Sequence, residues 1–221
     1  MTTVYYADVS PLNNDTIYNA ALALIGPEMQ KKSRSLKHRS DRNLSVGARL
    51  LLVHSLRERG INVDELEFRI RKGGKPYISN IEGLQFSLSH SGDMAVCAVS
   101  DLDVGVDTEQ TGTFNPDICK RFFHKSEYSA ILANSDKQKQ QEVFFRLWTL
   151  KESYVKMTGS GIGGFADCVI DTTNEPRIIL GEADAGFREW SVGGYRVALC
   201  SKADVSDVEL KRINLIKMLI I

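Results

Sequence analysis

Two stretches of the sequence carry side chains whose types and spacing suit chemistry at phosphate. The first, Asp103–Glu109, reads D-V-G-V-D-T-E, and as a strand it directs Asp107 and Glu109 to one face. Neighbouring carboxylates on a strand face repel each other. They serve either to keep an edge strand from aggregating or to bind a hard cation such as Mg²⁺. This motif alone leaves both interpretations open.

The second stretch, Val143–Gly161, is expected to form a helix with a charged face. Trp148, Glu152 and Lys156 follow one another at four-residue spacing on that face. A solvated Glu–Lys pair explains the two charges, but a large aromatic side chain has little reason to face water. Trp148 therefore favours a functional surface. The opposite, apolar face consists of Val143, Leu147, Leu150, Tyr154 and Met157.

Composition limits the partners of the protein. The chain has 221 residues, enough for one large domain or two small ones, and equal numbers of basic and acidic residues, 28 each. Zero net charge argues against bulk nucleic acid or an anionic membrane as the main partner. No signal-like segment opens the sequence, and the apolar C-terminal stretch 215–221 is too short to span a bilayer. Four widely spaced cysteines predict buried free thiols in a reducing cytoplasm.

The expected elements suggest an internal repeat. Arg49–Gly60, followed by strands, echoes Arg146–Gly161, also followed by strands, at an offset of about one hundred residues. This echo predicts two similar α+β halves that meet near Leu102. Helices are expected at 14–25, 44–59, 115–123, 126–133 and from 143 onward, and strands at 4–8, 66–71, 86–88, 94–100, 103–109, 167–171, 187–192 and 195–201. Residues 134–141 read as a polar connector, and the tail 208–221 as a strand or a short helix.

Two further segments each admit two interpretations. Residues 31–42 form the most basic run, which is either a solvated helix face or a surface that binds phosphates. His90 lies in an expected hairpin loop, Ser89–Asp93, and is either a structural histidine or a ligand contact.

Taken in order, the motifs resemble those of the phosphopantetheinyl transferases. V-G-V-D-T-E, F-F-H-K-S-E-Y and W-T-L-K-E-S-Y-V-K-M-T-G-S-G follow G-G-K-P-Y-I and F-S-L-S-H-S-G-D. The resemblance runs from Pro27 to Ser201. It is closer to the two-lobed type that activates surfactin synthetase than to the short trimeric holo-acyl-carrier-protein synthases. It implies an enzyme that moves the phosphopantetheine arm of coenzyme A onto a serine of an apo acyl, aryl or peptidyl carrier protein, releasing adenosine bisphosphate.

The same resemblance assigns roles to the second half of the chain. Asp107, Glu109 and Glu152 would hold Mg²⁺, and Glu152 would also act as the general base toward the carrier serine. Lys156 would neutralise the phosphate being transferred. Trp148 would then pack beside the site, which accounts for its position on the charged face.

In the first half, the resemblance implies contacts to coenzyme A. Lys75, Ser89 and His90 match positions that bind its phosphates, and Lys32 and Arg42 are the candidates for its ribose phosphate.

With anion contacts in one half and metal contacts in the other, we expect a pseudo-twofold α+β monomer. Its subdomains would be 1–102 and 103–221, with the active site in the cleft between them. Family analogy puts carrier docking near Thr111–Phe123. Fatty-acid, polyketide and nonribosomal-peptide carriers all present a suitable serine, so the pathway stays open.

Three rival functions remain at this point. Another Mg²⁺-dependent phosphoryl-transfer or pyrophosphate-cleaving enzyme would share the acidic residues but use water as the nucleophile. A non-catalytic carrier-binding module would have no need of the full set Asp107, Glu109, Glu152 and Lys156. A nucleic-acid binder using residues 31–42 is disfavoured by the zero net charge and the lack of interleaved aromatics.

Overall fold

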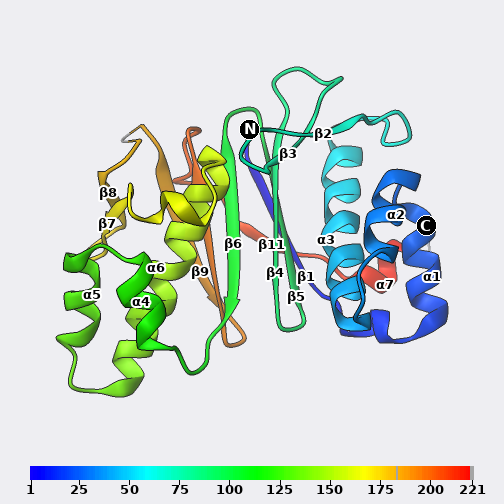
Figure 1. Cartoon of the computed structure of the whole chain (residues 1–221). Coiled ribbons are helices and arrows are strands. Elements are labelled where there is room, and N and C mark those ends of the chain that lie inside the picture. Colours follow the sequence, from blue (N-terminus) through cyan, green and yellow to red (C-terminus); the bar gives the residue numbers. More distant parts are fainter. Residues whose placement is uncertain (183, 220–221) are drawn as a thin grey trace.

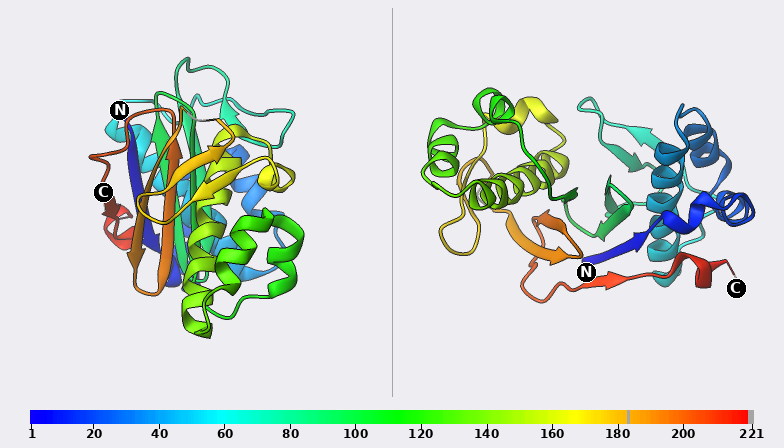
Figure 2. Two further views of the ribbon diagram at one scale, coloured as in Figure 1. Left: turned by 90° about the vertical axis from the view of Figure 1, so that its left-hand side faces the viewer. Right: turned by 90° about the horizontal axis from the view of Figure 1, so that it is seen from below.

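The structure, a computed structural model, describes residues 1–182 and 184–219 and has two lobes (Figure 1). Helices lie at the two outer sides of the molecule and strands between them, as the view from below also shows (Figure 2). No helix within the described ranges combines the length and the apolar character needed to cross a bilayer.

The first lobe is a four-stranded sheet covered by the 20-residue helix α3 (Arg39–Glu58). The strand order is β11-β1-β5-β4, in which only the β1–β11 pair is parallel. Its strands are β1 (Thr3–Asp8), β4 (Gln85–Ser91), β5 (Met94–Ser100) and β11 (Leu210–Arg212), with β2 (Phe68–Ile70) and β3 (Pro76–Ile78) as a separate hairpin. The other helices are η1 (Ser10–Asn13), α1 (Asp15–Leu24), α2 (Pro27–Arg34) and α7 (Leu215–Met218).

The second lobe is a three-stranded antiparallel sheet, ordered β6-β10-β9, packed against the 22-residue helix α6 (Lys137–Thr158). Its strands are β6 (Val104–Gln110), β9 (Gly186–Val192) and β10 (Tyr195–Ser201), with β7 (Val169–Asp171) and β8 (Arg177–Leu180) as a separate hairpin. Its shorter helices are α4 (Pro116–Phe122), α5 (Lys125–Leu132) and η2 (Ile162–Phe165).

The two lobes repeat one order of elements, which confirms the predicted two-lobed α+β fold. In each lobe a first strand leads through short helices to the long helix, then to a short hairpin and a final hairpin. In each sheet the last strand pairs antiparallel with both the first strand and its own hairpin partner, giving β1-β5-β4 and β6-β10-β9. Edge strands β4 and β6 lie side by side where the lobes meet, and we call this boundary the seam.

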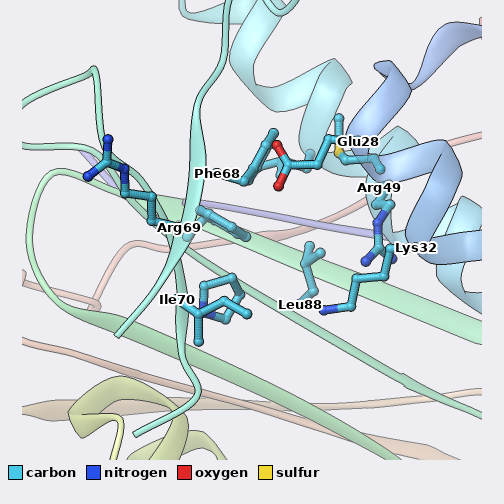
Figure 3. Close-up of a pocket in the computed structure, with 11 residues that line it drawn as sticks. Glu28, Lys32, Arg49, Phe68, Arg69, Ile70 and Leu88 are labelled. Atoms are coloured by element: carbon cyan, nitrogen blue, oxygen red, sulfur yellow. The ribbon is translucent and has the colours of Figure 1, made fainter. Parts of the chain in front are cut away.

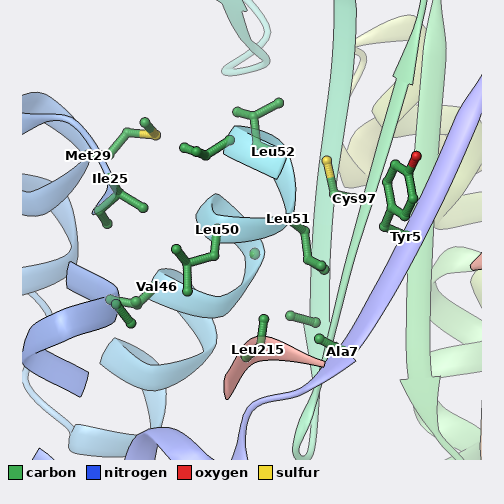
Figure 4. Close-up of a cluster of buried hydrophobic side chains, with 14 of the residues drawn as sticks. Tyr5, Ala7, Ile25, Met29, Val46, Leu50, Leu51, Leu52, Cys97 and Leu215 are labelled. Atoms are coloured by element: carbon green, nitrogen blue, oxygen red, sulfur yellow. The ribbon is translucent and has the colours of Figure 1, made fainter. Parts of the chain in front are cut away.

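Three hydrophobic cores hold this arrangement. One lies in the first lobe between α3 and the sheet, where Leu51 points toward β5, the strand that carries Cys97 (Figure 4). A second fills the space between α6 and the second sheet, and includes Leu147 and Leu150 as the helical spacing predicts. The third joins the lobes, because residues of β1 and β5 pack there with residues of β6 and β10. The predicted buried free state holds for the four cysteines, Cys97, Cys119, Cys168 and Cys200.

The tail returns to the first lobe. The predicted subdomains, 1–102 and 103–221, place the tail in the second half. In the structure, however, β11 pairs with β1, and Leu215 of α7 is buried in the core of the first lobe. Both a strand and a short helix form there, where the sequence offered one or the other. The outer edge of β1 accepts β11, a pairing between residues some two hundred positions apart that no local pattern reveals.

Several element boundaries differ from the predictions. The expected loop around His90 is strand: β4 continues to Ser91, and the turn contains only Gly92 and Asp93. The connector before α6 is helical from Lys137, because the Asp136 side chain caps the helix by accepting from Gln138 N. Helix α5 is capped by His124 in a capping box with Glu127, and Ser126 lies within the helix. The hairpin strand β8 has no counterpart in the predictions.

Gly105 sets the distance between β6 and α6. A Cβ atom at this position would collide with the backbone at Ser153 and Met157 of α6. Since backbone atoms cannot rotate away, only glycine lets the strand and the helix approach this closely.

We therefore expect Gly105→Ala to lower the free energy of unfolding by about 1–3 kcal/mol, the usual cost of overpacking. The matched control is Gly112→Ala, where a new Cβ meets no atom within 4 Å. The control should stay within about 0.5 kcal/mol of the wild type. Urea unfolding of both variants measures the difference, and equal stabilities would show that the two elements can separate at little cost.

Candidate active site

Strand β6 and helix α6 together carry the predicted acidic residues. Alternation along β6 sends Val104 and Val106 into the core between the lobes and leaves Asp107 and Glu109 on the face toward α6. The first sequence prediction, two carboxylates on one strand face, is compatible with this geometry.

Asp107 lies at the centre of the contacts across the seam. It is 3% exposed, and its Oδ1 accepts from the Ser89 hydroxyl of β4 (2.7 Å) and from Lys156 Nζ of α6 (2.6 Å). Lys156 Nζ also donates to Ser89 Oγ (2.9 Å). The other carboxylate oxygen, Oδ2, is buried without a hydrogen-bond partner among the described residues. One oxygen of Asp107 is thus held by both lobes, and the other has no hydrogen-bond partner among the described residues.

Glu109 is held in a similar way. Its Oε2 accepts from the Ser91 hydroxyl (2.8 Å), and its Oε1 accepts from Trp148 Nε1 (3.3 Å). Trp148 therefore contacts the site through its indole nitrogen, while its ring packs among phenylalanines such as Phe144 and Phe165. Burial first, and then the charge of Asp107, raise the pKa of Glu109.

Glu152, one turn before Lys156 on α6, completes the acidic group. Burial raises its pKa to about 7, the charges of Asp107 and Glu109 add to the effect, and Lys156 opposes it. Mutual electrostatic influence indicates that the three carboxylates lie near one another.

Within residues 1–182 and 184–219, no three His, Cys, Asp or Glu side chains lie in a ready-made metal geometry. The chemistry of the donors nevertheless suits Mg²⁺, because Asp107, Glu109 and Glu152 are carboxylates that influence one another electrostatically and Asp107 Oδ2 is buried without a partner among the described residues. A divalent cation would relieve the like-charge repulsion that raises these pKa values. Asp107, Glu109 and Glu152 are therefore the residues that could hold it.

A cavity of about 250 Å³ opens beside Glu152. Glu152 and Lys156 line it from the second lobe, and Lys75, Ser87 and Leu88 line it from the first. The site predicted between the halves thus has a cavity to which both lobes contribute. The glycine-rich turn before β3 comes so close to the end of α6 that a Cβ at Gly73 would strike the backbone of Gly159.

Lys75 bridges the lobes at this cavity. It is 8% exposed, and its Nζ donates to the backbone carbonyls of Val104 (3.0 Å) and Met157 (2.8 Å). Burial lowers its pKa to about 8. Its ammonium group therefore ties the β2–β3 turn to β6 and to the last turn of α6, a contact that sequence reasoning missed.

A second cavity, of about 130 Å³, adjoins the first along Phe86 and Leu88 of β4. The Lys32 and Arg49 side chains extend next to each other at its wall (Figure 3). Arg49 was not predicted, and the predicted Arg42 does not line this cavity. Arg42 and Arg49 lie two turns apart on the same face of α3, so the periodicity of the basic helix was the signal available.

His90 points away from the acids, because it alternates with Ser89 and Ser91 on β4. It is exposed, but neighbouring protein atoms partly desolvate it and, together with the charges of Lys156 and Arg49, lower its pKa. His90 is therefore close to the cationic groups of both cavities. Ser89 differs, since its hydroxyl is fully engaged by Asp107, Lys156 and the backbone N–H of Thr108.

Comparison with known proteins assigns the family. The family model "4'-phosphopantetheinyl transferase superfamily" matches residues 103–200, and "4'-phosphopantetheinyl transferase, N-terminal" matches residues 10–102. The 4'-phosphopantetheinyl transferase psf-1 of Bacillus pumilus is 31% identical over 160 residues, which cover 69% of this chain and 68% of that protein. The chain belongs to the 4'-phosphopantetheinyl transferase superfamily.

Other members of the superfamily match a shorter part. The 4'-phosphopantetheinyl transferase Sfp of Bacillus subtilis is 36% identical over 143 residues, which span 64% of this chain and 63% of that protein. The match to Sfp therefore covers just under two thirds of its length. A solved structure, the holo-(acyl-carrier-protein) synthase of Thermotoga maritima, overlaps with a TM-score of 0.38 at 21% identity, over 45% of this chain and 62% of that one.

The F-F-H-K-S-E-Y motif of this chain has a structural role. Glu127 of this motif is 4% exposed and pairs with the fully buried Lys151 (2.8 Å). Its oxygens also accept from the backbone N–H groups of His124 and Ile170. This pair ties α5 and β7 to α6 next to Glu152, so Glu127 is occupied in holding the helix.

The shifted pKa of Glu152 has a consequence for stability. The folded protein keeps this proton up to about pH 7, whereas the unfolded chain releases it near pH 4.5. The folded state therefore binds more protons in that interval, so the contribution of Glu152 to stability falls as pH rises through it.

We expect Glu152→Gln to increase the stability of the metal-free protein at about pH 8 and to change it much less at about pH 5. Chemical unfolding in a chelator at both pH values tests this expectation. An equal increase in the free energy of unfolding at both pH values would mean that burial and neighbouring charges do not raise the pKa of Glu152.

Proposed function

We propose that this chain transfers the phosphopantetheine arm of coenzyme A to a serine of an apo carrier protein in a Mg²⁺-dependent reaction. The observation that carries the proposal is the group formed by Asp107, Glu109, Glu152 and Lys156 beside a cavity that both lobes line. Membership of the superfamily supports the same conclusion.

The proposed reaction forms one bond and breaks one at phosphorus. The carrier serine oxygen attacks the phosphorus that bears pantetheine, and the bond from that phosphorus to the bridging oxygen breaks. Adenosine bisphosphate leaves, and the serine proton passes to the Glu152 carboxylate. When bound, Mg²⁺ supplies stabilisation of negative charge on the pyrophosphate oxygens. Asp107, Glu109 and Glu152 would hold the cation.

Two of these residues would do further work. Glu152 would accept the serine proton as the general base, because its side chain lines the cavity that both lobes form. Lys156 is bonded to Asp107 and Ser89, and this fixes its ammonium group beside the cavity. A fixed positive charge there would stabilise the transferring phosphoryl group without reorganisation during the reaction.

The anionic nucleotide would lie along β4. We assign the pyrophosphate to the cavity of Glu152 and Lys156, with His90 nearby, and the ribose phosphate to the neighbouring cavity of Lys32 and Arg49. Lys75 would act by holding the lobes together, and Arg42 would contribute from a position two turns before Arg49 on α3.

The same proposal extends to the docking of the carrier protein, the oligomeric state and the location in the cell. Carrier proteins would dock near Thr111–Phe123, where partly buried side chains such as Phe114 and Phe122 extend the aromatic cluster of Trp148. A monomer suffices, because one chain supplies both halves of the site. Four buried free cysteines support a cytoplasmic location.

The decisive experiment is intact-mass spectrometry of purified apo carriers after incubation with coenzyme A and Mg²⁺. The expected result is a mass gain of one phosphopantetheine on the carrier, accompanied by release of adenosine bisphosphate. Cleavage of coenzyme A at a rate that the carrier leaves unchanged, with no gain in carrier mass, would instead favour the pyrophosphate-cleaving alternative.

Glu152→Gln should lower turnover by about two to four orders of magnitude, the usual span for loss of a general base. Its affinity for coenzyme A should change little, because the cationic contacts remain. Glu152→Asp should recover part of the turnover, limited by its shorter reach. Transfer kinetics and calorimetry measure the two effects, and normal turnover in Glu152→Gln would exclude it as the base.

Lys32→Ala should weaken the binding of coenzyme A more than that of dephospho-coenzyme A, which lacks the ribose phosphate. Arg42→Ala should show a smaller difference between the two ligands, because Arg42 does not line the cavity. Calorimetric titration with both ligands measures the ratio. Equal losses of affinity for both ligands in Lys32→Ala would favour the other interpretation of residues 31–42, a solvated helix face.

A further inference from the structure

Three serines of β4 form a column along the seam. They occupy alternate positions, and each hydroxyl oxygen accepts a hydrogen bond from a backbone N–H of β6. The bonds join Val106 N to Ser87 (3.0 Å), Thr108 N to Ser89 (3.3 Å) and Gln110 N to Ser91 (3.1 Å). Serine side chains thus take the place of the backbone carbonyls that a neighbouring strand would offer, and they set the register of the two edge strands.

Ser91 differs from the other two serines, because it also donates a hydrogen bond to Glu109. Its hydroxyl accepts from Gln110 N and donates to Glu109 Oε2 (2.8 Å), so both bonds fix its orientation. Trp148 of α6 donates to the other oxygen of the same carboxylate. Glu109 is therefore held by one donor from each lobe.

Glu109 needs such donors because its neighbourhood repels it. The Asp107 carboxylate lies on the same strand face, and its charge acts on Glu109 together with partial burial. Lys156 pairs with Asp107 and not with Glu109. A Glu109 side chain with fewer donors would turn away from Asp107 toward water, since solvent stabilises a carboxylate that neighbouring charges oppose.

We propose that Ser91 is a positioning residue of the metal site: it holds Glu109 toward Asp107 and Glu152 from across the seam. The inference rests on the proposed function, in which Glu109 is a metal ligand. Its consequence is that the ligand set is complete only when β4 and β6 are in register.

The test compares Mg²⁺ affinity with stability in the full chain. Calorimetric titration of Mg²⁺ at saturating coenzyme A should show affinity about tenfold weaker or more in Ser91→Ala, as for other residues that orient metal ligands. Ser91→Thr keeps the hydroxyl and should restore wild-type affinity. Ser87→Ala, which loses a bond to β6 but no contact to an acid, calibrates the cost in unfolding free energy.

Two further variants separate the proposed role of Ser91 from a folding defect and from an error in the metal assignment. Ser91→Cys gives the same comparison at nearly constant volume with a weak donor, and should weaken Mg²⁺ binding even if Ser91→Ala does not fold. Glu109→Gln tests the underlying assignment. If it weakens Mg²⁺ binding while Ser91→Ala and Ser91→Cys lose only stability, Ser91 merely joins two strands and the inference is overturned. If Glu109→Gln leaves Mg²⁺ binding unchanged, the metal assignment itself fails.

Discussion

The candidate active site depends on a single buried carboxylate at the boundary between two lobes. Burial of the Asp107 charge is costly and is tolerated only where a counter-charge and hydrogen bonds compensate for lost water. Ser89 of the first lobe and Lys156 of the second supply them at one oxygen. The second oxygen is left without a partner in the described structure, which is the property expected of a carboxylate that waits for a cation.

The duplicated fold makes this arrangement possible. Each lobe alone ends in an edge strand with unpaired backbone groups, and the two edges meet at the seam. The shared core, Lys75 and the returning tail keep the lobes in register. Gly105 then allows α6 to approach β6 closely, so Glu152 and Lys156 arrive beside Asp107. The geometry of the candidate site therefore depends on contacts between the two lobes and is not set by either lobe alone.

The sequence predicted those parts of the site that follow from local periodicity. Alternation along β6 predicted the shared face of Asp107 and Glu109, and helical spacing predicted the face that carries Trp148, Glu152 and Lys156. The echo between the halves predicted the repeated order of elements.

The missed features are contacts between residues far apart in the chain. Helical spacing places Lys151 beside the apolar stripe, but only the fold brings Glu127 to it. Likewise, no local signal pairs the serines of β4 with β6 or β11 with β1. Arg42 was chosen over Arg49 because the basic run ends at residue 42, whereas the cavity lies two helical turns farther along α3.

The most direct test of the account is the response of Asp107→Asn to Mg²⁺. Asparagine keeps the shape of the side chain and the hydrogen bonds at Oδ1, but it removes one of three mutually repelling charges. Because the substitution also removes the counter-charge of Lys156, the melting temperature of each metal-free protein serves as its own reference. Mg²⁺ added with coenzyme A should raise the melting temperature of the wild type and not that of the variant, and the variant should transfer no phosphopantetheine. A variant that Mg²⁺ stabilises like the wild type, with transfer intact, would contradict the account.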